Sequence, residues 1–588
     1  LWLHLGLGRI YAASGPILTT DPFLHTASSP PEAHGWLADV FLHEVAQWTG
    51  FTGLRVLHAS IVVVFLGLAW WIVRRETRSS MAASLAVATL TLLAAYRLVQ
   101  LRPQLFSMVA VLVLYACFLS KAASIRAWKL AAIAAFAAVW ANVHPAFLLA
   151  PILSAAAATG LVGMAITQRG AVRWNEDARR ASYLAGLAVC ALAGACLNPD
   201  GVDRLLLNLA AGNGTASLGA VADEWGAFPF LGWPGGNLPP TPAVWMAAWT
   251  LFLCVPALGL RALVHSSTRG EDDDGATRRL LDPALLGLAA ASLVAGAIAV
   301  RFLWLAFFPI LLVTIAWTDP REAAPPHESR RSTGGLAIAL VLPLAFYVFG
   351  PWAIVGQFTN ASVSAYQRAF PPERYYGHAV WFLSDAGLEG NLYNPYFMGN
   401  FLGYWLEPKV KVFANGSLRM SDRVLATSHE IVSRLPNDRD ETFFDLLDRY
   451  AVDVFLGVGL PDIPRSRRPW HYTTTHLDRE PGWILVFRNL ESAVHLRRDA
   501  ANAENLARIS AYYRRIGVPF DPATGFDVAR VLRAAPRWAI EQGIVPVDFQ
   551  ALQQAASTAK KPRRMAARDR LASIYVALGL YDQAIELD

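Results

Sequence analysis

The sequence predicts an α-helical polytopic membrane domain, followed by a small α/β domain and a helical tail. Two observations support this prediction. Of the 588 residues, 54% are hydrophobic and only 16% are charged, and the mean hydropathy is +0.34. A soluble protein carries about 25% charged residues, so the deficit points to burial in a bilayer. Charged residues are also sparse up to about residue 356 and ordinary after it, which predicts a water-exposed region behind the membrane domain.

Composition and pattern divide the chain into four expected parts. Residues 1–55 are expected to form a first extracytoplasmic loop with an amphipathic helix, and residues 56–356 a transmembrane domain of about ten spans. Residues 357–495 are expected to form an extracytoplasmic α/β domain, and residues 496–588 a helical region. Because the chain opens on Leu1, without a signal peptide, and stops inside a helical pattern, we expect a fragment truncated at both ends.

Ten apolar runs are long enough, or nearly so, to cross a hydrocarbon core of ~30 Å. The run at 130–142 is separated from its successor only by Asn-Val-His-Pro, so the two could be one broken helix. The runs between 282 and 317 are interrupted only by Arg301. The predicted spans are 56–73, 82–97, 105–121, 130–142, 146–167, 183–197, 241–260, 282–300, 302–317 and 335–356.

The loops between these runs alternate in positive charge. One set holds most of the Lys and Arg residues, such as Arg74, Arg75 and Arg78 after the first run, and the other set holds few. The positive-inside rule places the basic set in the cytoplasm. The opening loop and everything after residue 357 are therefore expected on the extracytoplasmic side. This topology explains the net charge of +6 without nucleic acid as a partner.

Acidic and imidazole side chains gather in the polar stretch at 19–40, before the first span. Asp21, Asp39 and His34 are candidate catalytic residues, because a carboxylate at the bilayer surface can act as general base toward a hydroxyl. Each also has a structural interpretation. Asp21 precedes a proline, as a helix N-cap does. Asp39 could lie on the solvated face of an amphipathic helix, and His34 could be an ordinary loop residue.

Further polar residues lie at the same predicted outer ends of the spans, where ionisable groups usually face a cavity or a partner. Cations near a base would stabilise a phosphate leaving group, so we regard these residues as candidates for substrate binding. Alternatively, the arginines extend to lipid headgroups, and the residues beside prolines shape turns. The candidates are Arg97, Arg102, Gln104, Asn142, His144, Asn198 and Arg301.

The chain resembles bacterial polytopic glycosyltransferases of the GT-C superfamily, which use lipid-phosphate sugars and include mannosyl- and arabinosyltransferases. Within that group it is similar to an uncharacterised branch with a C-terminal extracytoplasmic domain. The segments that carry the resemblance, spread over about residues 1–490, are LWLHLGLGRIY, TTDPF, HGWLADV, RPQLFS, WANVHPAFLL, LNPDG, NLYNPYFMGNFLGYWLEPKVKVFANGS and LDRYAVDVFL.

The resemblance implies a GT-C-like helical bundle in the bacterial inner (plasma) membrane, with the active-site acids in the first outer loop. Asp21 and Asp39 are the acids in the matching loop, and a divalent cation (Mg or Mn) assists some relatives. The metal ligands are unknown, with these two aspartates as the candidates. Relatives usually carry an acidic residue just before LW-x-H, which would precede Leu1 here. They often have Glu in a His-Glu-Trp run, whereas this chain has His34-Gly35-Trp36.

The region after the spans mixes strand and helix patterns. VKVFANG and VDVFLGVG are rich in β-branched and aromatic residues, which favours strands, and AVWFLSDAGL and ETFFDLLDRYA favour helices. NPYFMGNFLGYW could cover the mouth of an active site or form a packed turn. Residues 568–588 carry small and aromatic residues in the tetratricopeptide (TPR) arrangement, and a single repeat needs neighbours to bury its face. These residues are Ala572, Tyr575, Gly579, Tyr581 and Ala584.

The leading functional hypothesis is transfer of a sugar, with inversion, from a polyprenyl-phosphate donor to an extracytoplasmic glycan, lipid or protein acceptor. Asp21 or Asp39 would activate the acceptor, and Arg102 and Arg301 would hold the phosphate. The alternative is a non-catalytic membrane scaffold that recruits envelope partners through its TPR region. A transporter is the third hypothesis, but the polar groups do not gather at mid-membrane and no repeat symmetry is evident.

Overall fold

The computed structural model describes residues 1–587 except 34, 122, 168–173, 204–225, 233–240, 269–280, 319–374, 418, 435–438 and 460–472. The chain forms two compact units. The helical unit comprises Leu1, Leu3–Ile17 and Glu32–Gly356, and the sheet unit comprises Trp2, Leu18–Pro31 and Gln357–Asp588. Residues 18–31 group with the sheet unit in this clustering, and the division of the chain into four parts stays a prediction.

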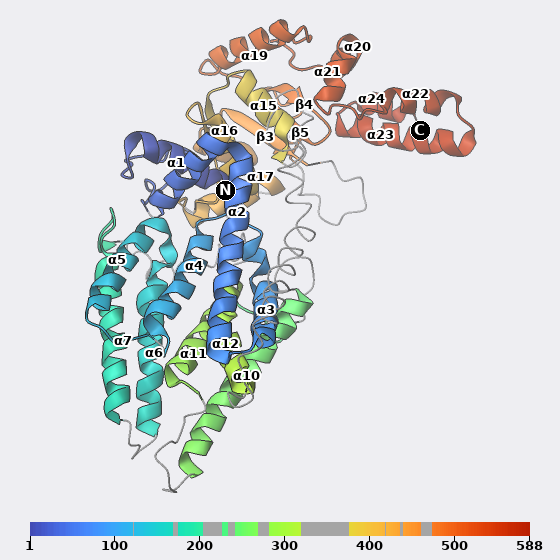
Figure 1. Ribbon diagram of the computed structural model, residues 1–588. Helices are drawn as coiled ribbons and strands as arrows, with labels where there is room; N and C mark the ends of the chain where they lie inside the picture. Colours follow the sequence, from blue (N-terminus) through green and yellow to red (C-terminus); the bar gives the residue numbers. More distant parts are fainter. Residues whose placement is uncertain are drawn as a thin grey trace. The chain divides into compact units, whose positions relative to one another are not determined.

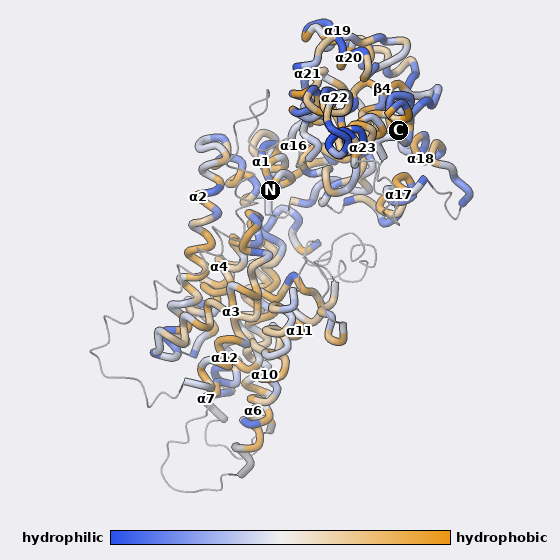
Figure 2. The backbone as a smooth tube through the Cα atoms, turned by 90° about the vertical axis from the view of Figure 1, so that its right-hand side faces the viewer, coloured by the Kyte–Doolittle hydropathy of each residue, from blue (hydrophilic) through white to orange (hydrophobic). Residues whose placement is uncertain are grey.

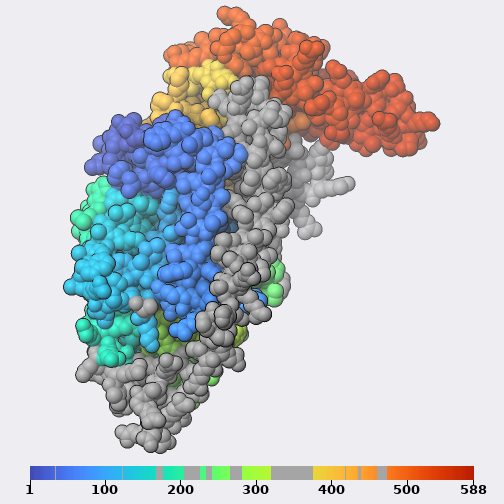
Figure 3. Space-filling view, viewed as in Figure 1, coloured from blue at the N-terminus to red at the C-terminus, as the bar shows by residue number. Residues whose placement is uncertain are grey.

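The helices of the helical unit lie side by side (Figure 1). In the space-filling view, the blue atoms of α2 lie directly against those of the helices that follow it (Figure 3). The described elements are α1 (Trp2–Ser14), α2 (Trp36–Thr77), α3 (Ser80–Leu98), α4 (Gln104–Leu114), the π-helix η1 (Tyr115–Leu119), α5 (Trp128–Val143), the 3₁₀-helix η2 (Pro145–Leu148), α6 (Leu149–Thr167), α7 (Trp174–Ala195), α10 (Pro242–Thr268), α11 (Pro283–Ile298), the 3₁₀-helix η5 (Val300–Ala306) and α12 (Phe307–Trp317).

Five helices in the described part of the chain are long and apolar enough to cross a membrane. This confirms the prediction of a helical membrane protein, and Figure 2 shows hydrophobic residues along these helices. The five are Trp36–Thr77, Ser80–Leu98, Pro145–Ile166, Pro242–Val264 and Val300–Trp317, with shorter apolar helices at Gln104–Leu119, Trp128–Val143 and Pro283–Ile298. The predicted span at 335–356 lies outside the described residues, and the orientation stays a prediction.

Two breaks in the apolar pattern are real breaks in helices. The α5 helix ends at Val143, and His144 is extended (φ −164°, ψ 144°) before Pro145 opens η2. Residue 299 is likewise extended between α11 and η5. A third break lies inside α2 at Gly50 (φ 65°, ψ −166°), and it separates an amphipathic first part from the apolar span.

Close approach of α6 and α11 depends on two facing glycines. A Cβ on Gly160 would lie 2.1 Å from the backbone oxygen of Pro283, and one on Gly287 would lie 2.2 Å from that of Ala156. Small residues at a membrane helix interface allow the backbones this contact, and the gain is van der Waals packing.

The sheet unit is built on a five-stranded mixed sheet in the order β2-β1-β3-β5-β4. The strand β1 pairs in parallel with β2 and β3, and β5 pairs antiparallel with β3 and β4. The strands are β1 (Gly390–Tyr393), β2 (Val410–Val412), β3 (Val454–Val458), β4 (Trp483–Arg488) and β5 (Ser492–Arg497). The predicted strands are confirmed as β2 and β3, whereas the other three were not predicted.

Short helices pack around this sheet and include both helices predicted there, found as α15 and α18. The aromatic NPYFMGNFLGYW segment forms the 3₁₀-helix η8 and the helix α16, so it is an ordered part of the fold. The bounds are α15 (Gly377–Asp385), η8 (Tyr396–Met398), α16 (Gly399–Leu406), α17 (Asp422–Ser433) and α18 (Phe443–Arg449).

The C-terminal region is helical, as predicted, and its first helix belongs to the sheet core. Tyr513 on α19 is fully buried, and its hydroxyl donates to the Val486 carbonyl at 2.6 Å. Gly579, with φ 75°, turns the chain between α23 and α24. The TPR assignment stays a prediction. The helices are α19 (Ala503–Ile516), α20 (Val528–Ala534), α21 (Pro536–Glu541), α22 (Phe549–Thr558), α23 (Lys561–Ala577) and α24 (Tyr581–Ile585).

Candidate active site

Asp21 is held in a buried ion pair within the sheet unit. Its Oδ1 accepts hydrogen bonds from the backbone N–H groups of Phe23 and Leu24, both at 2.8 Å, and its Oδ2 lies 2.9 Å from Nη1 of Arg419. The Asp21 side chain is 1% exposed and that of Arg419 is 8% exposed. Asp21 therefore caps a turn, not a helix, and both of its oxygens are already engaged.

The segment around Asp21 is an edge of the sheet. The backbone N–H of Val412 donates to the Phe23 oxygen at 2.7 Å, and that of His25 donates back to Val412 at 3.2 Å. Leu24 forms a parallel bridge with Val412. The predicted catalytic loop is thus divided, because 18–31 pairs with β2 whereas Asp39 lies in the helical unit.

Asp39 forms a hydrogen-bonded pair with a histidine that sequence reasoning missed. Nδ1 of His4, on α1, lies 2.8 Å from Oδ1 of Asp39, in the first turn of α2. The Asp39 side chain is only 4% exposed, so it is not on a solvated face, whereas the His4 side chain is 26% exposed. The two helices touch closely, since a Cβ on Gly8 would lie 2.1 Å from the Asp39 backbone oxygen.

The pairing fixes the tautomer of His4. An ionised carboxylate only accepts hydrogen bonds, so Nδ1 carries the proton and the lone pair of neutral His4 lies on Nε2. Burial lowers the pKa of His4 well below its usual value, and the positive charge of Arg102 lowers it further. His4 is therefore neutral at physiological pH, and Arg102 is close enough to act on it electrostatically.

Three helices converge on the first turns of α2. Trp36 Nε1 donates to Oδ1 of Asn142 at 2.7 Å, and the Asn142 amide donates to the Leu197 carbonyl at 2.8 Å. The ring of Phe41 lies 6.0 Å from that of Phe106 on α4. Asn142 lies near the end of α5, and its hydrogen bonds connect the start of α2 to the residues that follow α7. It thereby positions the first turn of α2, which carries Asp39.

His144 and Gln104 occupy neighbouring helix ends. Nδ1 of His144 accepts from the Ala146 N–H at 3.2 Å and lies 2.9 Å from the Ser107 hydroxyl, which also accepts from Trp140. His144 therefore caps the break between α5 and η2. Gln104 is buried at the first position of α4, two residues after Arg102.

The remaining candidates lie at other helix ends and turns in the described part of the helical unit. Arg97 is buried at the end of α3, with its guanidinium carbon 5.2 Å from the Tyr96 ring. Asn198 holds a turn with the Asp200 N–H at 2.9 Å, and Arg301 is half-buried in η5. His34 lies outside the described residues. The substrate-binding roles of these side chains stay predictions.

The described residues contain no group of three His, Cys, Asp or Glu side chains that could hold a metal ion. Asp21 and Asp39, the predicted ligand candidates, lie in different units, and each is engaged with a basic side chain. Because each aspartate is already paired with a basic side chain, we derive no catalytic step through a divalent cation.

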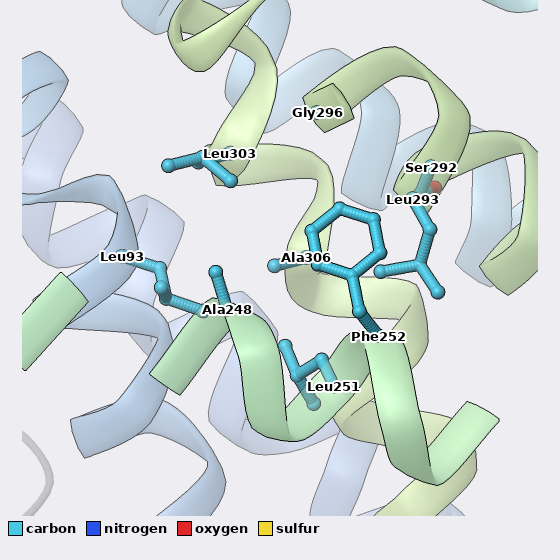
Figure 4. A pocket seen from close by; sticks show the side chains of 9 residues that line it. All are labelled: Leu93, Ala248, Leu251, Phe252, Ser292, Leu293, Gly296, Leu303 and Ala306. Carbon is cyan, nitrogen blue, oxygen red and sulfur yellow. The ribbon is translucent and has the colours of Figure 1, made fainter. Parts of the chain in front are cut away.

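An apolar crevice lies deeper in the helical unit, where α3, α10, α11 and η5 meet (Figure 4). Its volume is about 10 Å³, near the minimum for one water molecule. Its one hydroxyl, on Ser292, already donates to the Leu288 carbonyl at 2.8 Å. The crevice is therefore a packing defect and is too small for a lipid chain.

No family model matches the chain, and no curated protein matches it. It is similar to two crystal structures of the Archaeoglobus fulgidus oligosaccharyltransferase. For the form tethered through a disulfide bond to an acceptor peptide containing the NVT sequon, the TM-score is 0.42 with 14% identity over 78% of this chain and 64% of that chain. For the apo form, the TM-score is 0.38 with 12% identity over 78% of this chain and 65% of that chain. The chain spans slightly less than two thirds of their length.

Proposed function

We propose that this chain is a membrane glycosyltransferase of the GT-C type, which transfers a sugar from a polyprenyl-phosphate donor to an extracytoplasmic acceptor in the bacterial inner membrane. The observation that carries the proposal is the 2.8 Å hydrogen bond between Nδ1 of His4 and the buried Asp39 carboxylate. A buried carboxylate that orients a partly exposed imidazole is a common arrangement for moving a proton.

In this proposal the general base is His4, whereas our sequence-based hypothesis gave that role to Asp21 or Asp39. With Asp39 buried, the group available to an acceptor is Nε2 of His4, and Asp39 is a positioning residue that holds the Nδ1 proton. Nε2 would take the proton of the acceptor hydroxyl as its oxygen attacks the anomeric carbon. The negative charge of Asp39 would favour the imidazolium that forms, whereas burial disfavours it and holds the pKa of His4 below its usual value.

The leaving group needs a positive charge close to this base. The bond between the anomeric carbon and the phosphate oxygen breaks, and the polyprenyl phosphate departs with the electron pair. Arg102, whose charge already acts on His4, would stabilise that phosphate. Attack from the side opposite to the leaving group gives inversion at the anomeric carbon.

The experiment uses full-length protein in lipid nanodiscs with a panel of polyprenyl-phosphate sugars, and it measures release of polyprenyl phosphate. His4→Gln removes the base and should lower kcat by about 10²–10⁴-fold. Asp39→Asn should lower kcat with little change in KM, because the amide no longer fixes the Nδ1–H tautomer.

The matched control is His58→Gln. His58 is another buried histidine on α2, whose Nε2 bonds to the Leu98 carbonyl at 2.8 Å, and its variant should turn over donor like the parent. Full activity in both His4→Gln and Asp39→Asn would refute the assignment of this pair. Absence of turnover with every donor would favour the scaffold hypothesis.

A further inference from the structure

The sheet unit contains a cleft in its C-terminal helices, far along the chain from the residues discussed above. Its volume is about 310 Å³, which falls in the range of ligand pockets. The cleft lies among α20 to α24, the group at the C-terminal end in Figure 1. The residues that line it come from all five helices and from Val545 in the α21–α22 loop.

The floor of the cleft is apolar. Leu532 and Ile540 line it together with Val545, Phe549 and Tyr575, which are 2%, 6% and 8% exposed. The Phe549 and Tyr575 rings meet edge to face, at an interplanar angle of 82°. Aliphatic side chains and buried rings do not form the flat exposed platform on which a sugar stacks, so the floor suits an apolar side chain better than a glycan.

The rim of the cleft is polar and rich in amides. Gln550, Gln553, Gln583 and Arg533 line it, and Gln553 Nε2 donates to the Tyr575 hydroxyl at 3.3 Å. A glutamine amide offers both a donor and an acceptor, as a peptide backbone requires. A lipid headgroup phosphate offers only acceptors and would not use the amide oxygens.

The surroundings of the cleft are strongly positive. Residues 529–570 contain nine basic and three acidic residues. Lys560, Lys561, Arg563, Arg564 and Arg568 are all exposed around the first turns of α23, and Figure 2 shows blue, hydrophilic residues near this helix label. Cations in the first turn oppose the helix dipole, so Lys560, Lys561, Arg563 and Arg564 gain no stabilisation from it.

Two of these basic residues lie on the same face of α23 as Tyr575, which lines the cleft. Arg568 and Arg564 precede Tyr575 by seven and eleven residues, which are about two and three turns at 3.6 residues per turn. All three therefore lie on the same side of α23. A ligand seated on the floor beside Tyr575 would extend past both guanidinium groups.

We propose that this cleft is the docking site for an acidic peptide segment of a partner protein. An apolar side chain of the peptide would occupy the floor, its backbone would pair with the glutamine rim, and its carboxylates would lie against Arg533, Arg564 and Arg568. Charge-assisted hydrogen bonds from arginine to carboxylate provide both affinity and orientation. This interaction is independent of the proposed glycosyltransferase activity, and it does not need the TPR assignment, because most of the lining precedes residue 568.

The test uses the full chain in nanodiscs of neutral lipid and three fluorescent peptides of about 12 residues. The first alternates Glu and Leu, the second replaces Glu with Lys, and the third replaces Leu with Ser. Only the Glu-Leu peptide should bind well, as measured by fluorescence anisotropy. Arg533→Glu and Arg568→Glu should each weaken that binding at least about tenfold, the effect of one lost charge-assisted contact.

The matched control is Arg537→Glu, an exposed arginine on α21 that does not line the cleft. It makes the same change in net charge and should leave binding nearly unaltered. An equal loss in this control, or equal binding of the Glu-Ser peptide, would show non-specific attraction and overturn the proposal. Absence of binding by the Glu-Leu peptide would also overturn it, as would binding of anionic phospholipid vesicles with the same dependence on Arg533 and Arg568.

Discussion

Replacing Asp21 by alanine is expected to release the Leu18–Pro31 segment from the sheet without changing the chemistry of the site. The substitution removes two backbone hydrogen bonds at 2.8 Å and the ion pair with Arg419 at 2.9 Å. It also leaves the Arg419 guanidinium, 8% exposed, without its counter-charge. Breaking a buried pair from one side costs about 3–5 kcal/mol.

Amide hydrogen exchange of the full chain in nanodiscs measures this loss directly. The backbone N–H groups of Phe23, Leu24 and His25 are bonded only while the segment is docked, so their exchange reports local opening. At 1.4 kcal/mol per tenfold change, about 3–5 kcal/mol corresponds to exchange faster by roughly two to three and a half orders of magnitude. Asp569→Ala, at an exposed position of the same unit, should leave these amides unchanged, because surface substitutions cost little.

The opposite pattern would refute the reasoning. If Asp21→Ala left the exchange of Phe23 and Leu24 unaltered but abolished sugar transfer, Asp21 would be a catalytic group, as one of our sequence-based hypotheses has it. If it accelerated exchange and left kcat per folded molecule intact, the structural role would hold. The two roles are thus separated by two measurements on one variant.

Three further predictions follow from packing and charge. Gly8→Ala should lower kcat at least about tenfold while the protein stays folded, because the new Cβ would lie 2.1 Å from the Asp39 backbone oxygen and force α1 away from α2; glycosyl transfer and circular dichroism measure the two effects. Arg180→Ala should destabilise the helical unit by about 2–3 kcal/mol in thermal unfolding, since it breaks the bidentate pair with Asp282 at 2.7 and 2.9 Å. Burial lowers the pKa of His25 to about 4, whereas unfolded histidine titrates near 6.5, so its contribution of up to about 3 kcal/mol should be lost as the pH falls from 6.5 to 4; His25→Phe should remove this pH dependence from urea unfolding.

The membrane helices were predictable because a long apolar run with few charges is typical of a helix that spans a bilayer. Every predicted span within the described residues coincides with a helix, including the two pairs separated by Asn-Val-His-Pro and by Arg301. The kink at Gly50 was not predicted, because the residues on either side both favour helix. In the sheet unit, β1 escaped prediction because it has only four residues, and such a strand depends on its neighbours in the sheet for its conformation.

The site was less predictable, because its contacts join residues far apart in the sequence. His4 lies in an apolar helix, where a single histidine usually indicates a core position, and its partner Asp39 is 35 residues away. The signal that was available is the position of Asp39 in a first helical turn beside Ala38 and Leu42, both buried. A carboxylate on the apolar side of an amphipathic helix needs a buried partner, and a histidine in the preceding helix is a natural one.

The two aspartates of the opening stretch show why composition alone could not separate their roles. Both are acidic, both are nearly fully buried, and each is paired with a basic side chain. The difference lies in that partner, because arginine stays protonated and only fixes a charge, whereas a neutral histidine can accept a proton at Nε2 while its Nδ1–H donates to Asp39. Arg419 holds Asp21 in a structural ion pair, whereas His4 gives Asp39 a partner that can carry out the proton transfer we propose. Exchanging His4 for arginine should therefore preserve the contact with Asp39 and abolish turnover.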